Sequence, residues 1–224
     1  MTTEPGNSLR GVRPTPLLDP LGAVYVDLEG TTDGDVAILG IGYFEASEWM
    51  LEQIVVDERL HRYAQYSCAK GLGVHAATLR EGMLRLQQLT SERGGSLVGF
   101  TSHEATVLPV LAQSVDVRLD INYIDAHKRA KAWARAAFPD KKPVRVSLRK
   151  PGSGYSIHWF AGLLGIPIPP SHGPGHTGNR LRELRASETT TQRMTSVRKG
   201  KWTNLLEHNR WDIEVMRDLI RAMS

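Results

Sequence analysis

The first residues in the chain that could carry chemistry are two carboxylates, Asp27 and Glu29, which follow the apolar run AVYV. Side chains two positions apart on a strand point to the same face of the sheet, so a strand here brings the two acids together. Two carboxylates on one face repel each other unless a cation lies between them. Solvated strand-end acids are the alternative, but a buried strand rarely ends in two unpaired charges, so the pattern favours a metal site.

A second signal lies near the C-terminus, in the segment HNRWDIEVM. His208 and Asp212 are four residues apart and therefore share one face of a helix. Asp212 opens an apolar stripe, which places its carboxylate near the packed side of that helix; the stripe consists of Ile213, Met216, Leu219 and Ile220. An ordinary His–Asp pair on a surface helix is the alternative interpretation.

Two further acids follow short predicted strands. Glu104, in VGFTSHEATVL, opens a helix, where the helix dipole favours a carboxylate whatever its function. Asp125 ends the run NYID and is a secondary candidate ligand. Each signal alone has an ordinary structural explanation, and it is their order along one chain that points to a shared site.

That order resembles the DEDD superfamily of 3′–5′ exonucleases, and more closely the RNase H-like domain found in predicted RecB-type nucleases. The resemblance spans about 22–222 and includes FTSHEATVL, NYIDAHKRA, VSLRKPGSGYSIHWFAGLLGI and HNRWDIEVMRDLI. It implies an RNase H-like fold with Asp27, Glu29, Glu104 and Asp212 as metal-binding acids. Two features depart from the common pattern. Glu104 stands where many members carry Asp, and His208 combines the side chain of one subgroup with the four-residue spacing of the Tyr-bearing subgroup.

Such a site would hydrolyse phosphodiester bonds with two divalent metal ions roughly 3.5–4 Å apart. Oxygen ligands favour Mg²⁺ or Mn²⁺ over Zn²⁺. We expect Asp27 to bridge both ions, Glu29 and Asp212 to hold the ion that activates water, and Glu104 to orient the second ion. His208 is the expected general base, because an imidazole is suited to taking a proton near neutral pH.

The basic residues suggest a nucleic-acid partner, DNA or RNA with a free 3′ end. The net charge is only +4, but Lys and Arg crowd two stretches, 141–150 and 180–201, and clustered cations attract phosphates. Solvated loops are the alternative. The expected contacts are Lys141, Lys142, Arg145, Arg149, Lys150, Arg198, Lys199 and Lys201.

The other histidines and Trp211 carry weaker signals. His172 and His176 lie in a Gly/Pro-rich segment without cysteine partners, so a zinc pair there is weakly supported. Trp211 could stack on a base, but its helical spacing favours a place in the core. The remaining histidines have the pattern of ordinary surface or core residues; they are His61, His75, His103, His127 and His158.

Hydrophobic periodicity predicts an α/β domain in which a mixed sheet of five to six strands is flanked by helices. Strands are expected at about 22–29, 36–45, 48–57, 96–100 and 121–127. Helical spacing covers 58–93, with core positions at Leu79, Met83, Leu84, Leu86 and Leu89. Further helices are expected after a cap at Ser102, and over 127–138, 156–166 and about 203–223.

A length of 224 residues suits one domain over 21–224, after an irregular tail at 1–20, with a long basic loop at 167–201. No apolar run reaches the roughly 18 residues of a membrane helix. The polar N-terminus lacks a signal-peptide stretch, and the single Cys68 allows no intramolecular disulfide. We therefore expect a cytoplasmic protein without a membrane partner.

Two other functions fit the same residues. One is a catalytically inactive nucleic-acid-binding or scaffold domain of the same fold. The other is a structure-selective endonuclease, since phosphodiester hydrolysis at such a site does not by itself require a chain end. The sequence does not distinguish DNA from RNA as the substrate.

Overall fold

The computed structural model of the chain describes residues 19–31, 35–68, 73–143, 154–170, 172, 176–186 and 194–224. The strands are β1 (Val24–Gly30), β2 (Val36–Glu45), β3 (Glu48–Val55), β4 (Val74–Ala76), β5 (Ser96–Gly99) and β6 (Asn122–Asp125). The helices are η1 (Glu58–Leu60), α1 (His61–Cys68), α2 (Leu79–Glu92), α3 (Ser102–Ser114), α4 (Ala126–Ala137), α5 (Ile157–Leu164), α6 (His176–Ala186) and α7 (Ser196–Met223).

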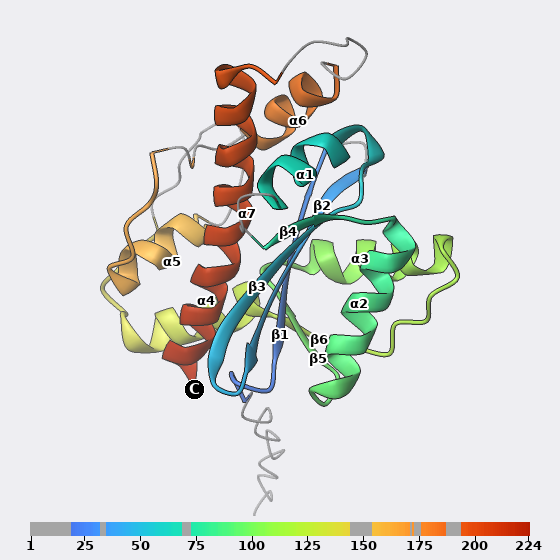
Figure 1. Cartoon of the computed structure of the whole chain (residues 1–224). Coiled ribbons are helices and arrows are strands. Elements are labelled where there is room, and N and C mark those ends of the chain that lie inside the picture. Colours follow the sequence, from blue (N-terminus) through green and yellow to red (C-terminus); the bar gives the residue numbers. More distant parts are fainter. Residues whose placement is uncertain are drawn as a thin grey trace, which may run out of the picture.

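The strands form one six-stranded sheet in the order β4-β3-β2-β1-β5-β6. The first three make an antiparallel meander, whereas β4 joins β3, β5 joins β1 and β6 joins β5 by parallel pairing. The predicted α/β class with a mixed sheet flanked by helices is therefore confirmed. Helices α2 and α3 cover one face of the sheet, and α7 lies along the other with α1, α4, α5 and α6 (Figure 1).

Strand β1 divides its side chains between these two faces. Val24 and Val26 pack into the core beneath α2 and α3, while Tyr25 packs against α7. Because successive side chains of a strand alternate between faces, Asp27 and Glu29 continue the face of Tyr25. The two acids therefore lie on the side of the sheet that α7 covers.

Two glycines of β2 let α7 approach the sheet closely. A Cβ at Gly40 would lie 2.1 Å from Asn209 Oδ1 and 2.6 Å from Ile213 Cδ1. A Cβ at Gly42 would lie 2.6 Å from Ile213 Cγ2. Since Gly40 pairs with Asp27 across the β1–β2 ladder, the same missing side chain brings α7 close to Asp27.

The region 58–93 departs from the predicted run of helical spacing, because it contains η1, α1, β4 and α2. Strand β4 is only three residues long, too short for an alternating pattern to be visible in the sequence. Met83, Leu86 and Leu89 are buried as predicted. Leu84 is 37% exposed, so its assignment to the core was wrong; it lies one position beyond Met83, on the outward side of α2.

The boundaries of two other helices also differ from the prediction. Helix α7 begins at Ser196, with Thr195 as its N-cap, rather than near 203. Helix α6 lies inside 167–201, so this segment is not simply a basic loop. Both helices contain so many basic residues that their apolar periodicity is weak in the sequence. That side packs into one core cluster through Leu181, Leu184, Trp202, Leu205 and Leu206.

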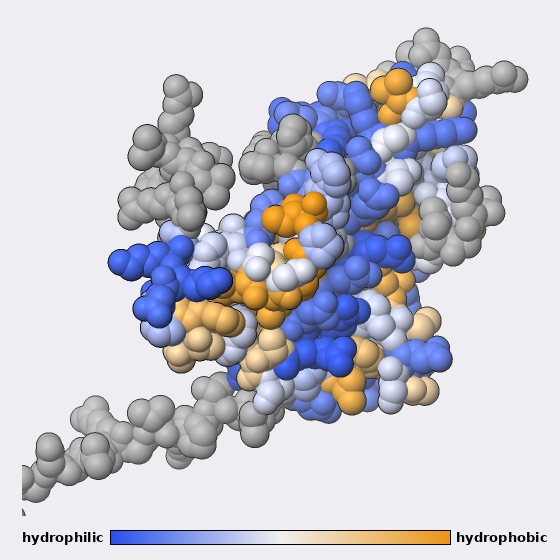
Figure 2. Space-filling view, turned by 90° about the vertical axis from the view of Figure 1, so that its left-hand side faces the viewer, coloured by the Kyte–Doolittle hydropathy of each residue, from blue (hydrophilic) through white to orange (hydrophobic). Residues whose placement is uncertain are grey.

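The outer face formed around α4 and α5 carries apolar side chains next to strongly hydrophilic ones (Figure 2). Aromatic residues contribute to it, since Trp133, Tyr155 and Trp159 are only partly buried. Within the described part of the chain, no helix is both long and apolar enough to cross a membrane.

Candidate metal centre

Three of the four predicted acids come together where α7 crosses the end of β1. Asp27, Glu29 and Asp212 each offer a carboxylate oxygen, and these atoms all lie within 4.8 Å of one another. The first two come from one face of β1 and the third from the buried side of α7. The sequence spacing of the D-x-E pair thus leads directly to the geometry that it predicted.

The electrostatics of this cluster favour a bound cation. Burial raises the pKa of Asp27 and of Glu29 well above their ordinary values, and the neighbouring carboxylates raise both further. Burial, followed by the charge of Glu104, raises the pKa of Asp212 to about 7. Glu29 Oε1 is buried and has no hydrogen-bond partner among the described atoms. Buried carboxylate oxygens crowded together, one of them without a hydrogen-bond donor, match the oxygen ligands that Mg²⁺ and Mn²⁺ prefer.

Asn209 and Gln53 form a chain of hydrogen bonds that fixes one of the acids, Asp27. The Asn209 side-chain amide donates to the Asp27 carboxylate at 2.8 Å, and Gln53 Nε2 donates to Asn209 Oδ1 and to the Leu206 carbonyl, each at 2.9 Å. Both amide side chains are buried. One oxygen of Asp27 is thereby fixed, and the bond from Asn209 partly offsets the rise in its pKa.

Glu104 lies beside this cluster rather than within it. Its Oε2 accepts hydrogen bonds from the backbone N–H and hydroxyl of Thr101, both at 3.1 Å, in a capping box at the start of α3. Thr101, not Ser102, is therefore the N-cap, which corrects the predicted cap. Glu104 is still close enough for its charge to raise the pKa of Asp27 and Asp212.

Tyr123 fixes the position of Glu104 from β6. Its hydroxyl lies 3.3 Å from Glu104 Oε2 and donates to the Thr101 carbonyl. This is possible because Gly99 has no side chain: a Cβ there would lie 2.1 Å from the Tyr123 hydroxyl. Asp125, the secondary candidate on the same strand, caps α4 by accepting from the Lys128 backbone N–H at 2.7 Å.

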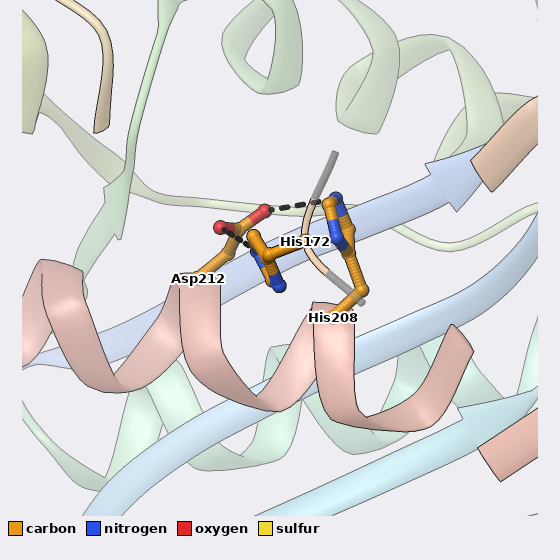
Figure 3. Close-up of side chains that lie close together, drawn as sticks. All are labelled: His172, His208 and Asp212. Carbon is orange, nitrogen blue, oxygen red and sulfur yellow. Dashed lines mark hydrogen bonds and ion pairs between the residues drawn. The ribbon is translucent and has the colours of Figure 1, made fainter. Parts of the chain in front are cut away.

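His208 faces the acids, and a second histidine accompanies it. His208 Nε2 lies 3.6 Å from Asp212 Oδ2 and 4.0 Å from Glu29 Oε1. His172 Nε2 lies 3.1 Å from Asp212 Oδ1. The two imidazoles stack with their centroids 3.7 Å apart, and each faces a different oxygen of the Asp212 carboxylate (Figure 3). The expectation that His208 stands next to the acids agrees with this geometry; the position of His172 was not predicted.

Aromatic packing holds His172 in place. Its ring contacts Trp211 at a centroid distance of 4.2 Å and His158 at 5.5 Å. Trp211 is buried in a core cluster, as its spacing predicted, and its Nε1 donates to the Pro167 carbonyl. Burial, followed by the charge of Arg180, lowers the pKa of His172 to about 4, so this imidazole is neutral at physiological pH.

The basic residues of the sequence have varied surroundings. Lys141 and Lys142 are exposed, while Arg145, Arg149, Lys150 and Arg193 lie outside the described residues. Lys199 packs over the Tyr66 ring and Lys201 pairs with Glu183. Arg185 pairs with Asp57 and Asp35 in a mostly buried cluster, so it serves the fold. Arg180 is the cation whose charge reaches the acids, since it lowers the pKa of Glu29.

Sequence reasoning missed Gln53 and Tyr123, named His172 only in a weakly supported zinc pair with His176, and gave Asn209 no role beyond its place in HNRWDIEVMRDLI. Asn209 carried the clearest signal, since it lies between His208 and Asp212 in HNRWD and its helical face is that of the core. Tyr123 lies two residues before Asp125. Gln53 is a single polar residue in a strand and His172 lies in a loop, and no local pattern relates either of them to the acids.

Comparison of the chain with protein-family models, with curated proteins and with solved structures finds no match.

Proposed function

We propose that the protein is a metal-dependent nuclease, a 3′–5′ exonuclease with an RNase H-like fold. The observation that carries this proposal is the group of three carboxylates, Asp27, Glu29 and Asp212, whose oxygen atoms gather within 4.8 Å on the covered face of the sheet. Carboxylates held this close, with raised pKa values, are suited to bind divalent cations.

The order of helices and strands supports the RNase H-like fold, and the order of the motifs supports an exonuclease. Three antiparallel strands come first, and helix, strand, helix, strand and helices follow, with α1 and β4 added between. This element order agrees with the resemblance to the RNase H-like domain. Support for an exonuclease in particular comes from the order of the motifs, D-x-E, Glu104 and HNRWD.

Each residue has a role that fits its surroundings. Two divalent ions, when bound, would make water a better nucleophile and neutralise charge that develops on the phosphate. Asp27, Glu29 and Asp212 would hold them, with Glu104 completing the second ion's ligands directly or through water. His208 would accept the proton of the attacking water at Nε2, which is the ring atom that faces Glu29 and Asp212.

Phosphate recognition would draw on the cations near the acids. The charge of Arg180 already acts on Glu29 and His172. Lys141 and Lys142 are exposed and available for backbone contacts. Such contacts position a strand without reading its sequence, so we expect little base preference.

The test is hydrolysis of 5′-labelled single-stranded DNA and RNA with Mg²⁺, Mn²⁺ or EDTA. Wild-type protein should shorten one of them from the 3′ end, and both EDTA and Asp27→Asn should abolish the ladder. Asp120→Asn, an exposed acid away from the site, is the matched control and should retain activity. Cleavage of a circular strand would indicate an endonuclease instead. Salt-sensitive binding without hydrolysis, in protein that is folded, would contradict the proposal and indicate a binding domain.

A further inference from the structure

A second group of potential ligands lies next to the carboxylates and differs from them in chemistry. His172, His208 and Asp212 each offer a ligand atom, and these atoms also lie within 4.8 Å of one another. Two of the three come from α7 and the third from the segment between α5 and α6. Figure 3 shows Asp212 with the two histidines. Asp212 belongs to both groups, so they adjoin through one carboxylate.

The spacing within this group is close to that of a zinc site. Ligand atoms about 2.0–2.1 Å from a tetrahedral Zn²⁺ lie roughly 3.4 Å from one another. His172 Nε2 is 3.1 Å from Asp212 Oδ1, and His208 Nε2 is 3.6 Å from Asp212 Oδ2. Both separations lie within about 0.3 Å of that spacing, and the two imidazoles would turn out of their stacked arrangement to direct both lone pairs at one ion.

The surroundings of His172 point to a ligand rather than to a surface residue. Its side chain is completely buried, and its Nε2 faces the Asp212 carboxylate rather than solvent. The rings of Trp211 and His208 hold it over α7. A cation bound by His172 Nε2, His208 and Asp212 would compensate for burying these ligand atoms together.

We propose that His172, His208 and Asp212 form a binding site for Zn²⁺, separate in selectivity from the carboxylate site. Nitrogen ligands favour Zn²⁺ over Mg²⁺, whereas the oxygen ligands of Asp27 and Glu29 favour Mg²⁺. Binding of Zn²⁺ engages His208. If the proposed nuclease function holds, Zn²⁺ therefore inhibits hydrolysis that Mg²⁺ supports; the site itself does not depend on that function.

The test is titration calorimetry with Zn²⁺ alone, in buffer with excess Mg²⁺. Every protein carries Cys68→Ser, because the exposed free thiol is itself a zinc ligand. We expect one tight site. His172→Ala should weaken it by at least about 100-fold, because even groups behind the ligands account for roughly 10–100-fold in affinity. His75→Ala, at an exposed histidine of β4, is the matched control and should bind as the parent protein does.

Two further measurements separate this site from the carboxylate site. Asp27→Asn should weaken Mg²⁺ binding while it leaves Zn²⁺ binding intact, and His172→Ala should do the reverse. Co²⁺ in place of Zn²⁺ should give visible absorption bands that His172→Ala removes, which reports coordination without any enzyme assay. Circular dichroism of the metal-free variants confirms that they fold. Zn²⁺ affinity that is unchanged in folded His172→Ala, or no stronger than that for Mg²⁺, would overturn the proposal.

Discussion

The side-chain amide of Asn209 donates a 2.8 Å hydrogen bond to the carboxylate of Asp27, although the two residues are 182 positions apart in the chain. This bond joins the last helix to the first strand at the point where the acids meet. Its other partner, Gln53, extends the connection to β3. The amide pair therefore sets the position of α7 and the orientation of the candidate ligand together.

Replacing Asn209 should consequently affect both metal binding and stability. In Asn209→Ala, Asp27 loses the donor that orients it, and we expect Mn²⁺ affinity to fall by roughly 10–100-fold. The free energy of unfolding should drop by about 1–3 kcal/mol, since a buried partner of Gln53 is lost. Calorimetric titration and urea unfolding measure the two effects. Gln88→Ala, at an exposed amide of α2, is the control and should change neither.

Because α7 packs closely on β2, adding one methyl group at Gly40 should strongly lower stability and metal binding. In Gly40→Ala, the new Cβ would overlap Asn209 and Ile213, so α7 must move away from the sheet. We expect a loss of about 1–3 kcal/mol in stability together with weaker metal binding. Gly162→Ala in α5 has nothing within 4 Å of its added Cβ and should be neutral or slightly stabilising. Equal melting temperatures for the two variants would contradict the close packing of α7.

The raised carboxylate pKa values predict how stability depends on pH without metal. The folded pKa of Asp212 is about 7, above its ordinary value of 3.8, so the folded state binds this proton more tightly than the unfolded state does. Stability is therefore lost as pH rises through about 7 and gained as it falls. The lowered pKa of His172 acts in the opposite direction, so the Asp212 effect is measured as a difference between proteins. In EDTA, the change in unfolding free energy from about pH 6 to about pH 8 should be more unfavourable for the wild type than for Asp212→Asn, by about 1 kcal/mol.

Asp212→Asn is the reference for that measurement, since it removes one titrating group and leaves His172 and the other acids in place. Divalent metal should act in the opposite direction. It binds the ionised carboxylates, so the stabilisation that Mn²⁺ provides should grow from about pH 6 to about pH 8. The same pH dependence in metal-free wild type and Asp212→Asn would show that Asp212 is not held against the other acids.

The sequence was most informative where one element carries the pattern by itself. Alternation along β1 and the stripe on α7 predicted which side Asp27, Glu29 and Asp212 face, and the structure places them together. The strand order and the extra strand β4 depend on pairing between distant segments, which no local period records. The same limit applies to His172, whose neighbours His208 and Asp212 are brought to it by tertiary packing alone.

Glu104 was predicted from the sequence as a metal ligand, but the same residue also fits the pattern of a helix cap. The segment Thr101-x-x-Glu104 has the form of a capping box, and the structure contains that box. The same carboxylate acts electrostatically on Asp27 and Asp212. One side chain thus has a structural role at the start of α3 and a candidate functional role at the metal centre, and sequence alone cannot separate the two.

A pair of matched substitutions distinguishes the capping role of Glu104 from its role at the metal centre. Gln can replace Glu in a capping box, so Glu104→Gln should keep α3 and change stability by less than about 0.5 kcal/mol, while it removes the charge. Without that charge the pKa of Asp212 should fall, and Mn²⁺ affinity and metal-dependent hydrolysis should fall by roughly 10–100-fold. Glu81→Gln alters the equivalent Thr78–Glu81 box of α2, away from the acids, and should leave metal binding unchanged. If both variants bind Mn²⁺ as tightly as the wild type, Glu104 serves only as a cap and the metal centre consists of Asp27, Glu29 and Asp212.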